Sequence, residues 1–174
     1  MNNLYGVTGM PLSGKSEAAE ILRENGFATL EMGDVVRIEK KERNLDRTEE
    51  SFVEAMREKH GKDAIARLSL PYFEKVMDEK EKIAIMGLRS LEEKHYFEDE
   101  LDTEIDIISI WASPETREER RKKRGREDDE ESLYSRDARE IDYGIGGLIA
   151  KSDYLIKNNG SLEDFREKVT DIVN

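Results

Sequence analysis

The stretch Gly6–Ser16, "GVTGMPLSGKS", decides the fold, because it carries the spacing of a phosphate-binding loop. Gly9 is followed by four residues and then by Gly14–Ser16, which reads Gly-Lys-Ser. A short apolar run precedes the loop and an amphipathic run follows it, so the sequence predicts a strand, the loop and a helix in that order. In such a loop the backbone amides surround the β-phosphate of a nucleotide, and the start of the helix adds partial positive charge.

The loop is therefore a candidate site for ATP. Lys15 would reach the β- and γ-phosphates and act in catalysis, and Ser16 would bind the Mg²⁺ ion that accompanies ATP. Leu12 departs from comparable loops, which carry glycine there; if the position has a positive φ, leucine costs ~1–2 kcal/mol relative to glycine. The alternative is a chance match or a loop that no longer binds. The expected nucleotide-binding residues are Gly9, Met10, Pro11, Leu12, Ser13, Gly14, Lys15 and Ser16.

The composition argues against several other classes of protein. A formal net charge of −12 on 174 residues disfavours sequence-independent binding to DNA or RNA, which needs a basic face. The chain has no cysteine, which excludes disulfides and cysteine metal sites. The sequence shows no secretion signal and no apolar run of membrane-spanning length. We therefore expect a cytoplasmic protein of one domain, residues 1–174, with no membrane partner.

Short apolar runs alternate with longer amphipathic runs, which is typical of a parallel sheet covered by helices. The expected strands are Leu4–Thr8, Ala28–Met32, Ile83–Met86, Ile105–Trp111 and Tyr154–Lys157, with Trp111 packed in the core. The expected helices are Lys15–Asn25, Asp34–Arg43, Glu50–His60 and Lys62–Glu79, followed by helices that begin after the capping residues Ser90, Ser113 and Ser161. Pro71 predicts a kink or a break in the fourth helix.

Two arginines mark a second anion site at the ends of strands. Arg37 ends "EMGDVVR", which resembles the Gly-Asp-x-x-Arg segment of adenylate kinases, and Arg89 lies in "GLRS", which resembles their Gly-x-x-Arg turn. In those enzymes both arginines grip the acceptor phosphate. Ligands of parallel sheets sit at the carboxyl ends of the strands, and paired guanidinium groups suit a dianionic phosphate. The alternative for each arginine is a surface ion pair. The expected substrate-binding residues are Gly33, Asp34, Arg37, Gly87 and Arg89.

A third basic region follows the fourth strand. The stretches "RRKKRGR", residues 120–126, and "SRDARE", residues 135–140, resemble the arginine-bearing helix and lid of nucleotide kinases. Arg120 and Arg124 are one helical turn apart, so both can face one nucleotide and stabilise charge on the transferring phosphoryl group. The alternative is a solvated charged helix. The expected catalytic residues here are Arg120, Arg124, Arg136 and Arg139, with Arg126 as a further candidate and Arg120 also a nucleotide ligand.

Together with "REKHGKDAIA", residues 57–66, and "DYLIKNNGSLE", residues 153–163, these stretches resemble an archaeal family of P-loop proteins related to adenylate kinase and dephospho-coenzyme A kinase. The resemblance runs in order through nearly the whole chain. It implies a three-layer α/β fold of the nucleoside monophosphate kinase type: a five-stranded parallel sheet, helices on both faces and a small lid at residues 120–143. It also implies that residues 34–79 form an acceptor-binding helical insert, and that Asn158 and Asn159 lie near the adenine of ATP.

The activity that the resemblance implies is phosphoryl transfer from ATP to a nucleoside monophosphate, with AMP as the first candidate. Such an acceptor is already an anionic oxygen, so positioning and charge neutralisation suffice. One alternative is a kinase acting on a hydroxyl, such as that of dephospho-coenzyme A, with Asp34 as the base. Another is a nucleotide-binding regulator or slow ATPase. Met86 stands where we expect an aspartate that orients magnesium-bound water, so we predict slow turnover that Met86→Asp would raise.

Overall fold

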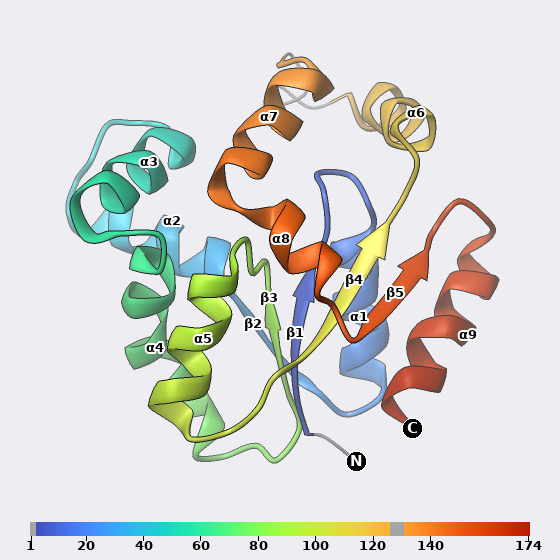
Figure 1. Ribbon diagram of the computed structural model, residues 1–174, viewed down its shortest axis with the longest axis horizontal. Coiled ribbons are helices and arrows are strands. Elements are labelled where there is room, and N and C mark those ends of the chain that lie inside the picture. The colour runs from blue at the N-terminus through green and yellow to red at the C-terminus, as the bar shows by residue number, and fades with distance from the viewer. Residues whose placement is uncertain (1–2, 126–130) are drawn as a thin grey trace.

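A sheet of five parallel strands forms the centre of the computed structural model, which describes residues 3–125 and 131–174. The strand order is β2-β3-β1-β4-β5 (Figure 1). The strands are β1 Leu4–Thr8, β2 Ala28–Glu31, β3 Ile83–Met86, β4 Asp106–Trp111 and β5 Tyr154–Lys157. The predicted sheet is confirmed, although β2 ends at Glu31 and β4 begins at Asp106, each one residue inside the expected bounds.

The central strands are buried on both faces, because helices cover the sheet on each side. Every residue of β1 and β3 is buried, as the continuous apolar runs of these strands predicted. On one face α1 Lys15–Glu24 and α9 Leu162–Val173 pack together. On the other face lie α5 Leu91–Leu101 and α8 Ile145–Ala150, with α4 Ala64–Met77 beside α5. The result is the expected three-layer arrangement.

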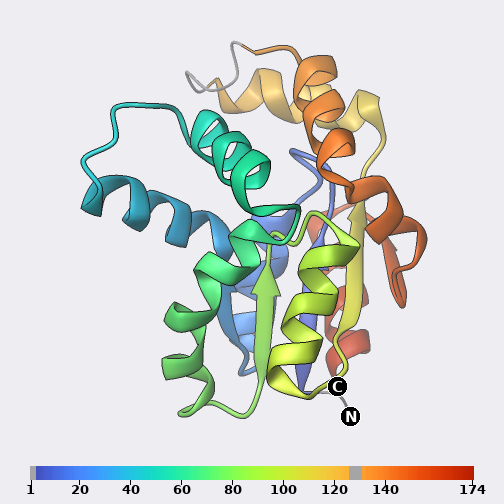
Figure 2. The same ribbon diagram turned by 60° about the vertical axis from the view of Figure 1, so that its left-hand side comes forward.

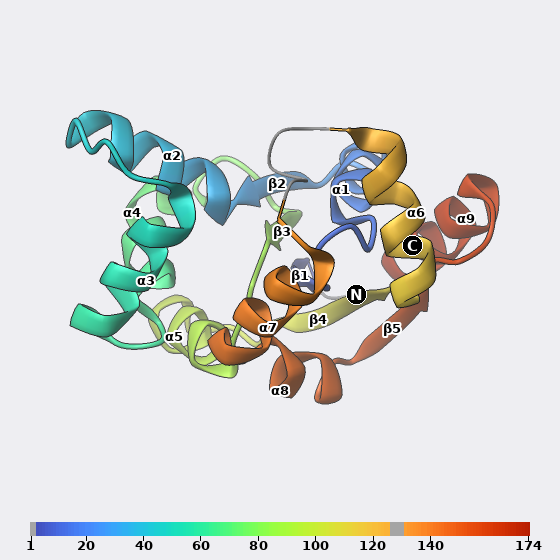
Figure 3. The ribbon, with the colours of Figure 1, turned by 90° about the horizontal axis from the view of Figure 1, so that it is seen from above.

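Four helices reach beyond the sheet at the carboxyl ends of its strands. They are α2 Met32–Glu42, α3 Glu49–His60, α6 Pro114–Arg124 and α7 Leu133–Tyr143. In Figure 2, α2 and α3 project to one side of the sheet, while α6 and α7 lie above it. Figure 3 looks down on the same end and shows α7 between α3 and α6. These helices surround the end of the sheet at which the phosphate loop leaves β1.

Local capping chemistry fixes where several helices begin. The hydroxyl groups of Ser90, Ser113 and Ser161 each accept a hydrogen bond from the backbone amide three residues later, so the predicted caps are confirmed. We expected a kink or a break at Pro71, and the break is not found, since α4 continues through this residue. Pro71 lies on the exposed side of α4, where the carbonyl that loses its helical partner can turn toward water.

Trp111 corrects another expectation. It is the last residue of β4 and is 37% exposed, so it is not a core residue. Trp111 is exposed because the buried part of β4 ends at the preceding residue, Ile110, which is 1% exposed. Within residues 3–125 and 131–174, no helix is both long enough and apolar enough to span a membrane.

Candidate nucleotide and acceptor sites

The phosphate loop connects β1 to α1, as predicted, and its glycines permit its tight path. Gly9 has φ 153° and Gly14 has φ 113°, and a Cβ at either position would collide with a neighbour. At Gly9 the collision would be with the backbone oxygen of Ile110, and at Gly14 with the side-chain amide of Asn158. The loop therefore rests closely against β4 and the β5–α9 connection.

Leu12 has the positive φ that the sequence analysis named as a condition for strain. Its φ is 65°, in the left-handed region that a leucine rarely adopts. The backbone cost is ~1–2 kcal/mol relative to glycine. The Leu12 carbonyl accepts a hydrogen bond of 3.0 Å from Arg120 on α6, which offsets part of this cost. The loop thus keeps its conformation with leucine in a position that favours glycine.

Lys15 begins α1 and points back along the loop. Its Nζ atom donates to the carbonyl oxygens of Gly9 at 2.6 Å and Met10 at 3.0 Å. Burial lowers the pKa of Lys15 from 10.5 to about 8, while the carboxylate of Glu140 acts to raise it. The lysine is therefore held where a nucleotide phosphate would meet it, and the charges of neighbouring elements already act on its pKa.

The loop also fits a magnesium ion bound together with ATP. Ser16 places its side chain in the exposed first turn of α1, and its hydroxyl oxygen is the kind of hard ligand that Mg²⁺ prefers. In residues 3–125 and 131–174 no group of three or more acidic or histidine side chains is placed to hold a metal ion. A metal here would thus depend on Ser16, water and the nucleotide's own phosphates. Mg²⁺ typically binds with this few protein ligands in phosphate-transfer sites.

Two arginines of α6 hold the outer side of the loop. Arg120 donates to the carbonyl oxygens of Leu12 and Ser13, each at 3.0 Å, and to that of Asn158 at 2.8 Å. Arg117, which the sequence analysis missed, forms a paired ion bridge with Asp137 of α7, with both nitrogen–oxygen distances 2.7 Å. Arg117 also donates to the Pro11 carbonyl at 3.3 Å. These contacts connect the loop to both α6 and α7.

The two asparagines after β5 support this arrangement. Asn158 is 6% exposed and donates its side-chain amide to the Ser13 carbonyl at 2.8 Å. Asn159 accepts a hydrogen bond of 2.9 Å from the Ser113 amide at the start of α6. Asn158 therefore fixes the loop, whereas Asn159 fixes the neighbouring turn. A role for Asn159 near the adenine remains a proposal.

A small cavity lies between the phosphate loop, α2, α3, the turn after β3 and α7. Its volume is about 110 Å³. It contains basic side chains from two elements and a part of the loop itself. The residues that line it are Pro11, Gly33, Val36, Glu49, Glu50, Val53, Arg89, Arg136, Arg139, Glu140 and Tyr143. Gly33, Arg89, Arg136 and Arg139 were predicted site residues, and the fold brings them together around one cavity.

Arg89 occupies the expected position at this cavity and is held by buried carboxylates. Its Nε atom lies 3.1 Å from Glu140, and its backbone amide donates to Glu93 at 2.7 Å. Glu93 is 1% exposed and also binds Arg57 of α3 at 3.0 Å. Burial raises the pKa of Glu93, although Arg57 opposes this shift. Arg57 also donates to the Tyr143 carbonyl at 2.7 Å, so one network joins α3, α5 and α7 around Arg89.

Arg37 lies farther out than predicted. It is not among the residues that line the cavity, and its side chain is 54% exposed. It pairs with Asp34 in the same helix and lies 3.4 Å from Glu49, which does line the cavity. The alternative of a surface ion pair thus describes Arg37 in this structure. Asp34 is likewise exposed and does not line the cavity. Gly87 also lies outside the cavity lining, and it has φ 85° in the turn that leads to Arg89.

The lid arginines differ in position. Arg136 and Arg139 line the cavity, and Arg139 is paired with Glu131 at 2.7 and 2.9 Å. Arg124 lies in the last turn of α6 and does not line the cavity. Arg126 lies outside the described residues. The sequence resemblance thus identified two lid arginines at the cavity, in addition to Arg89, but could not rank the arginines of α6.

Met86 differs from the expectation that its position faces the metal. Its side chain is 1% exposed and packs in the apolar cluster beneath α1. The register pairs Met86 with Glu31 at the end of the neighbouring strand β2. Burial raises the pKa of Glu31, and Lys15 acts to lower it. Glu31 is therefore a carboxylate at the strand ends close enough to interact with Lys15, and the sequence analysis missed it.

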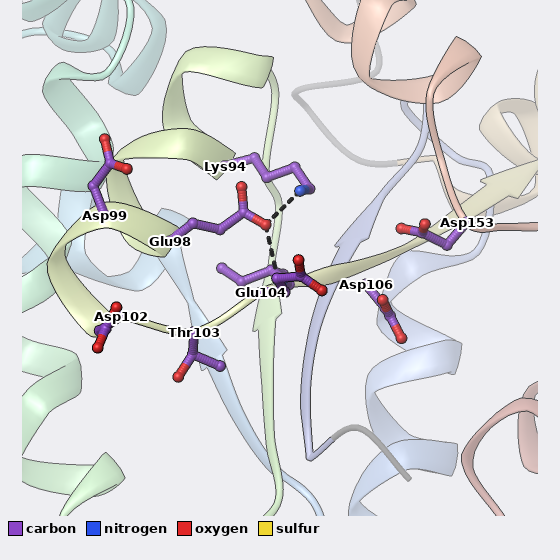
Figure 4. A pocket seen from close by; sticks show the side chains of 9 residues that line it. Lys94, Glu98, Asp99, Asp102, Thr103, Glu104, Asp106 and Asp153 are labelled. Carbon is purple, nitrogen blue, oxygen red and sulfur yellow. Dashed lines mark hydrogen bonds and ion pairs between the residues drawn. The ribbon is translucent and has the colours of Figure 1, made fainter.

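A larger cavity of about 580 Å³ lies at the opposite edge of the sheet. Figure 4 shows its acidic lining, in which Glu98 accepts hydrogen bonds from Lys94 and the Ile105 amide. Asp102, Glu104, Asp106 and Asp153 also line it. Its negative charge is unsuited to phosphate, so its greater volume does not make it the nucleotide site.

Comparison with known proteins confirms the predicted fold. The family model described as "AAA domain" matches residues 6–142. UPF0200 protein MJ1399 from Methanocaldococcus jannaschii is 42% identical over 176 residues, which is 98% of this chain and 88% of that protein. The crystal structure of TT1252 from Thermus thermophilus superposes with a TM-score of 0.67 at 17% identity, over 98% of this chain and 95% of the other. Dephospho-CoA kinase from Campylobacter jejuni gives 0.59 at 20% identity, over 99% and 96%.

Proposed function

Because this chain belongs to the archaeal UPF0200 family and has the fold of P-loop kinases, we propose that it transfers a phosphoryl group from ATP to a nucleoside monophosphate. AMP is the first candidate acceptor. The observation that carries the proposal is the shared cavity: Pro11 of the phosphate loop and Arg89 of the acceptor turn line the same space. A donor phosphate on the loop and an acceptor phosphate on Arg89 would therefore be neighbours.

The size of the cavity suits the reacting end of the acceptor. Its volume of about 110 Å³ can take a phosphate group but not a whole nucleotide. A wider groove of about 690 Å³ between α3 and α7 shares Arg139 and Tyr143 with it. The nucleoside would lie in this groove, with α2–α4 as the acceptor-binding insert and the segment of α6 and α7 as the lid.

The roles of the side chains follow from charge and position. The loop amides, Lys15 and Ser16 would hold ATP with Mg²⁺, which supplies positive charge to the β- and γ-phosphates. Arg89 and Arg136 would bind the acceptor phosphate and the transferring group from the side opposite the loop. Because Arg117 and Arg120 bind loop carbonyls, they position the loop, and Arg120 need not touch the nucleotide to matter.

The hydroxyl-kinase alternative is less well supported in the form that the sequence suggested. It requires a base, and Asp34, the residue named for that role, is exposed, paired with Arg37 and outside the cavity. A phosphate acceptor requires no base. The arrangement of Arg89 and Arg136 around a phosphate-sized space therefore favours the monophosphate.

The test is ADP formation from ATP and Mg²⁺, first alone and then with AMP, other nucleoside monophosphates or dephospho-coenzyme A. We expect AMP to stimulate ADP formation strongly and Arg89→Ala to remove the stimulation. Arg37→Ala is the matched control, because Arg37 lies outside the cavity and should retain most of it. ADP formation that no acceptor stimulates would support the slow ATPase or regulator instead, and stimulation by dephospho-coenzyme A alone would support the hydroxyl kinase.

A further inference from the structure

Glu140 places a carboxylate inside the acceptor cavity, where an anionic acceptor would have to bind. The residue is 9% exposed and comes from the last turn of α7. Its Oε2 atom lies 3.1 Å from the Nε atom of Arg89. Among the hydrogen bonds and ion pairs of residues 3–125 and 131–174, this is the contact that Glu140 makes through its side chain. Arg89 thus already has an anion beside it before any acceptor arrives.

The same carboxylate acts on the donor side of the cavity. Among the charged groups around Lys15, Glu140 has the largest effect and favours the protonated amine. Lys15 belongs to the loop and Arg89 to the turn after β3, so Glu140 interacts electrostatically with a cation of the donor site and contacts a cation of the acceptor site. A transferring phosphoryl group would carry its negative charge in this region.

Among the carboxylates of the cavity, Glu140 is the best placed to compete with an acceptor anion for Arg89. Arg139 has its own partner in Glu131, and Glu49 lies beside Arg37 at the outer side. Glu50 lines the cavity from α3, and no ion pair joins it to another described residue. Among the carboxylates that line the cavity in the described residues, Glu140 is the one that is buried and forms an ion pair with Arg89.

We propose that Glu140 is a specificity-determining residue of the acceptor cavity: its carboxylate competes with the acceptor's anionic group for Arg89 and so limits which anions bind. The inference rests on the proposed function in taking this cavity as the acceptor site. In the empty protein the carboxylate holds the half-buried guanidinium group of Arg89 in place at the cavity. A dianionic phosphate that binds through several groups displaces it, whereas a weaker anion does not.

Calorimetry on the ADP-saturated protein tests this directly, with AMP and inorganic phosphate as separate probes. Glu140→Gln keeps the shape of the side chain and removes its charge, so AMP should bind about tenfold more tightly, and the affinity for inorganic phosphate should rise by a larger factor than that for AMP. Glu167→Gln on α9 is the matched control, since it changes net charge equally at an exposed position far from the cavity. It should bind both anions as the parent does.

The double variant Glu140→Gln/Arg89→Ala separates competition from a general charge effect. If Glu140 acts through Arg89, the gain should disappear in this variant. Unchanged or weaker anion binding by Glu140→Gln, or no measurable binding to it, would overturn the inference. The inference would also be overturned if Glu140→Gln lost phosphoryl transfer to a hydroxyl acceptor while its anion affinity stayed unchanged, because Glu140 would then act as a base. A gain in anion affinity without ADP formation from ATP and AMP would leave this inference standing and count against the proposed function alone.

Discussion

Raising the pH from 7 to 9 should weaken ADP binding about tenfold, because Lys15 loses its proton over this range when the site is empty. The pKa of Lys15 in the empty protein is about 8. The protonated fraction therefore falls from about nine-tenths at pH 7 to about one-tenth at pH 9. Phosphates on the loop favour the charged amine, so the bound form stays protonated over the whole range.

The assay is calorimetry with ADP at pH 7, 8 and 9, repeated in buffers of different ionisation enthalpy. Such buffers reveal the expected uptake of close to one proton per ADP bound at pH 9. ADP itself is almost fully ionised above pH 7, so its own titration contributes little. Lys15→Arg should bind ADP with an affinity that does not change between pH 7 and 9, since its guanidinium keeps its charge.

Lys15→Met should bind ADP weakly and equally at all three pH values. The reasoning would be refuted if the parent's affinity stayed constant to pH 9 with no proton uptake. That result would mean that burial does not lower the pKa of Lys15, or that the lysine does not contact the phosphates.

Three further predictions concern stability. Leu12→Gly should raise the free energy of unfolding by about 1 kcal/mol in urea denaturation, because glycine adopts φ 65° without strain; a decrease would show that the leucine side chain stabilises the loop more than its backbone costs. Met86→Asp should lower the free energy of unfolding by ~3–5 kcal/mol rather than raise kcat, since the new carboxylate would be buried among apolar side chains. A stable variant that forms ADP faster than the parent would instead support the prediction made from the sequence. Asp137→Ala should lower the free energy of unfolding by about 3 kcal/mol and weaken ADP binding, because it leaves the buried Arg117 without its paired carboxylate. An unchanged melting temperature would contradict the role given to this pair.

The fold could be predicted largely from local pattern. The strands of the sheet were identified to within a residue, because buried parallel strands are continuously apolar. The capping serines predicted where three helices begin, because a cap depends only on the first turn of its own helix. Pro71 does not break α4, because the effect of a proline depends on which side of the helix faces water.

The site could be predicted only in part, because partner choice depends on the tertiary structure. Arg89 follows a strand, and its place at the sheet's edge is a consequence of topology. The contacts of Arg57 with Glu93 and of Arg117 with Asp137 join residues 36 and 20 positions apart, and no local pattern specifies them. Arg57 does open the stretch "REKHGKDAIA", so the resemblance held a signal that the residue types alone did not. Glu140 likewise ends the stretch "SRDARE", but nothing in that stretch specifies its contact with Arg89.

A bisubstrate analogue tests whether the loop and the Arg89 cavity form one phosphoryl-transfer site. The ligand is two adenosines joined by five phosphates, and the measurement is its affinity relative to ADP. If both belong to one site, the analogue should bind at least about 100-fold more tightly than ADP, because one molecule fills both halves. Arg89→Ala should remove this advantage while leaving ADP affinity intact. An analogue that binds no more tightly than ADP, with an affinity unaffected by Arg89→Ala, would contradict a single phosphoryl-transfer site.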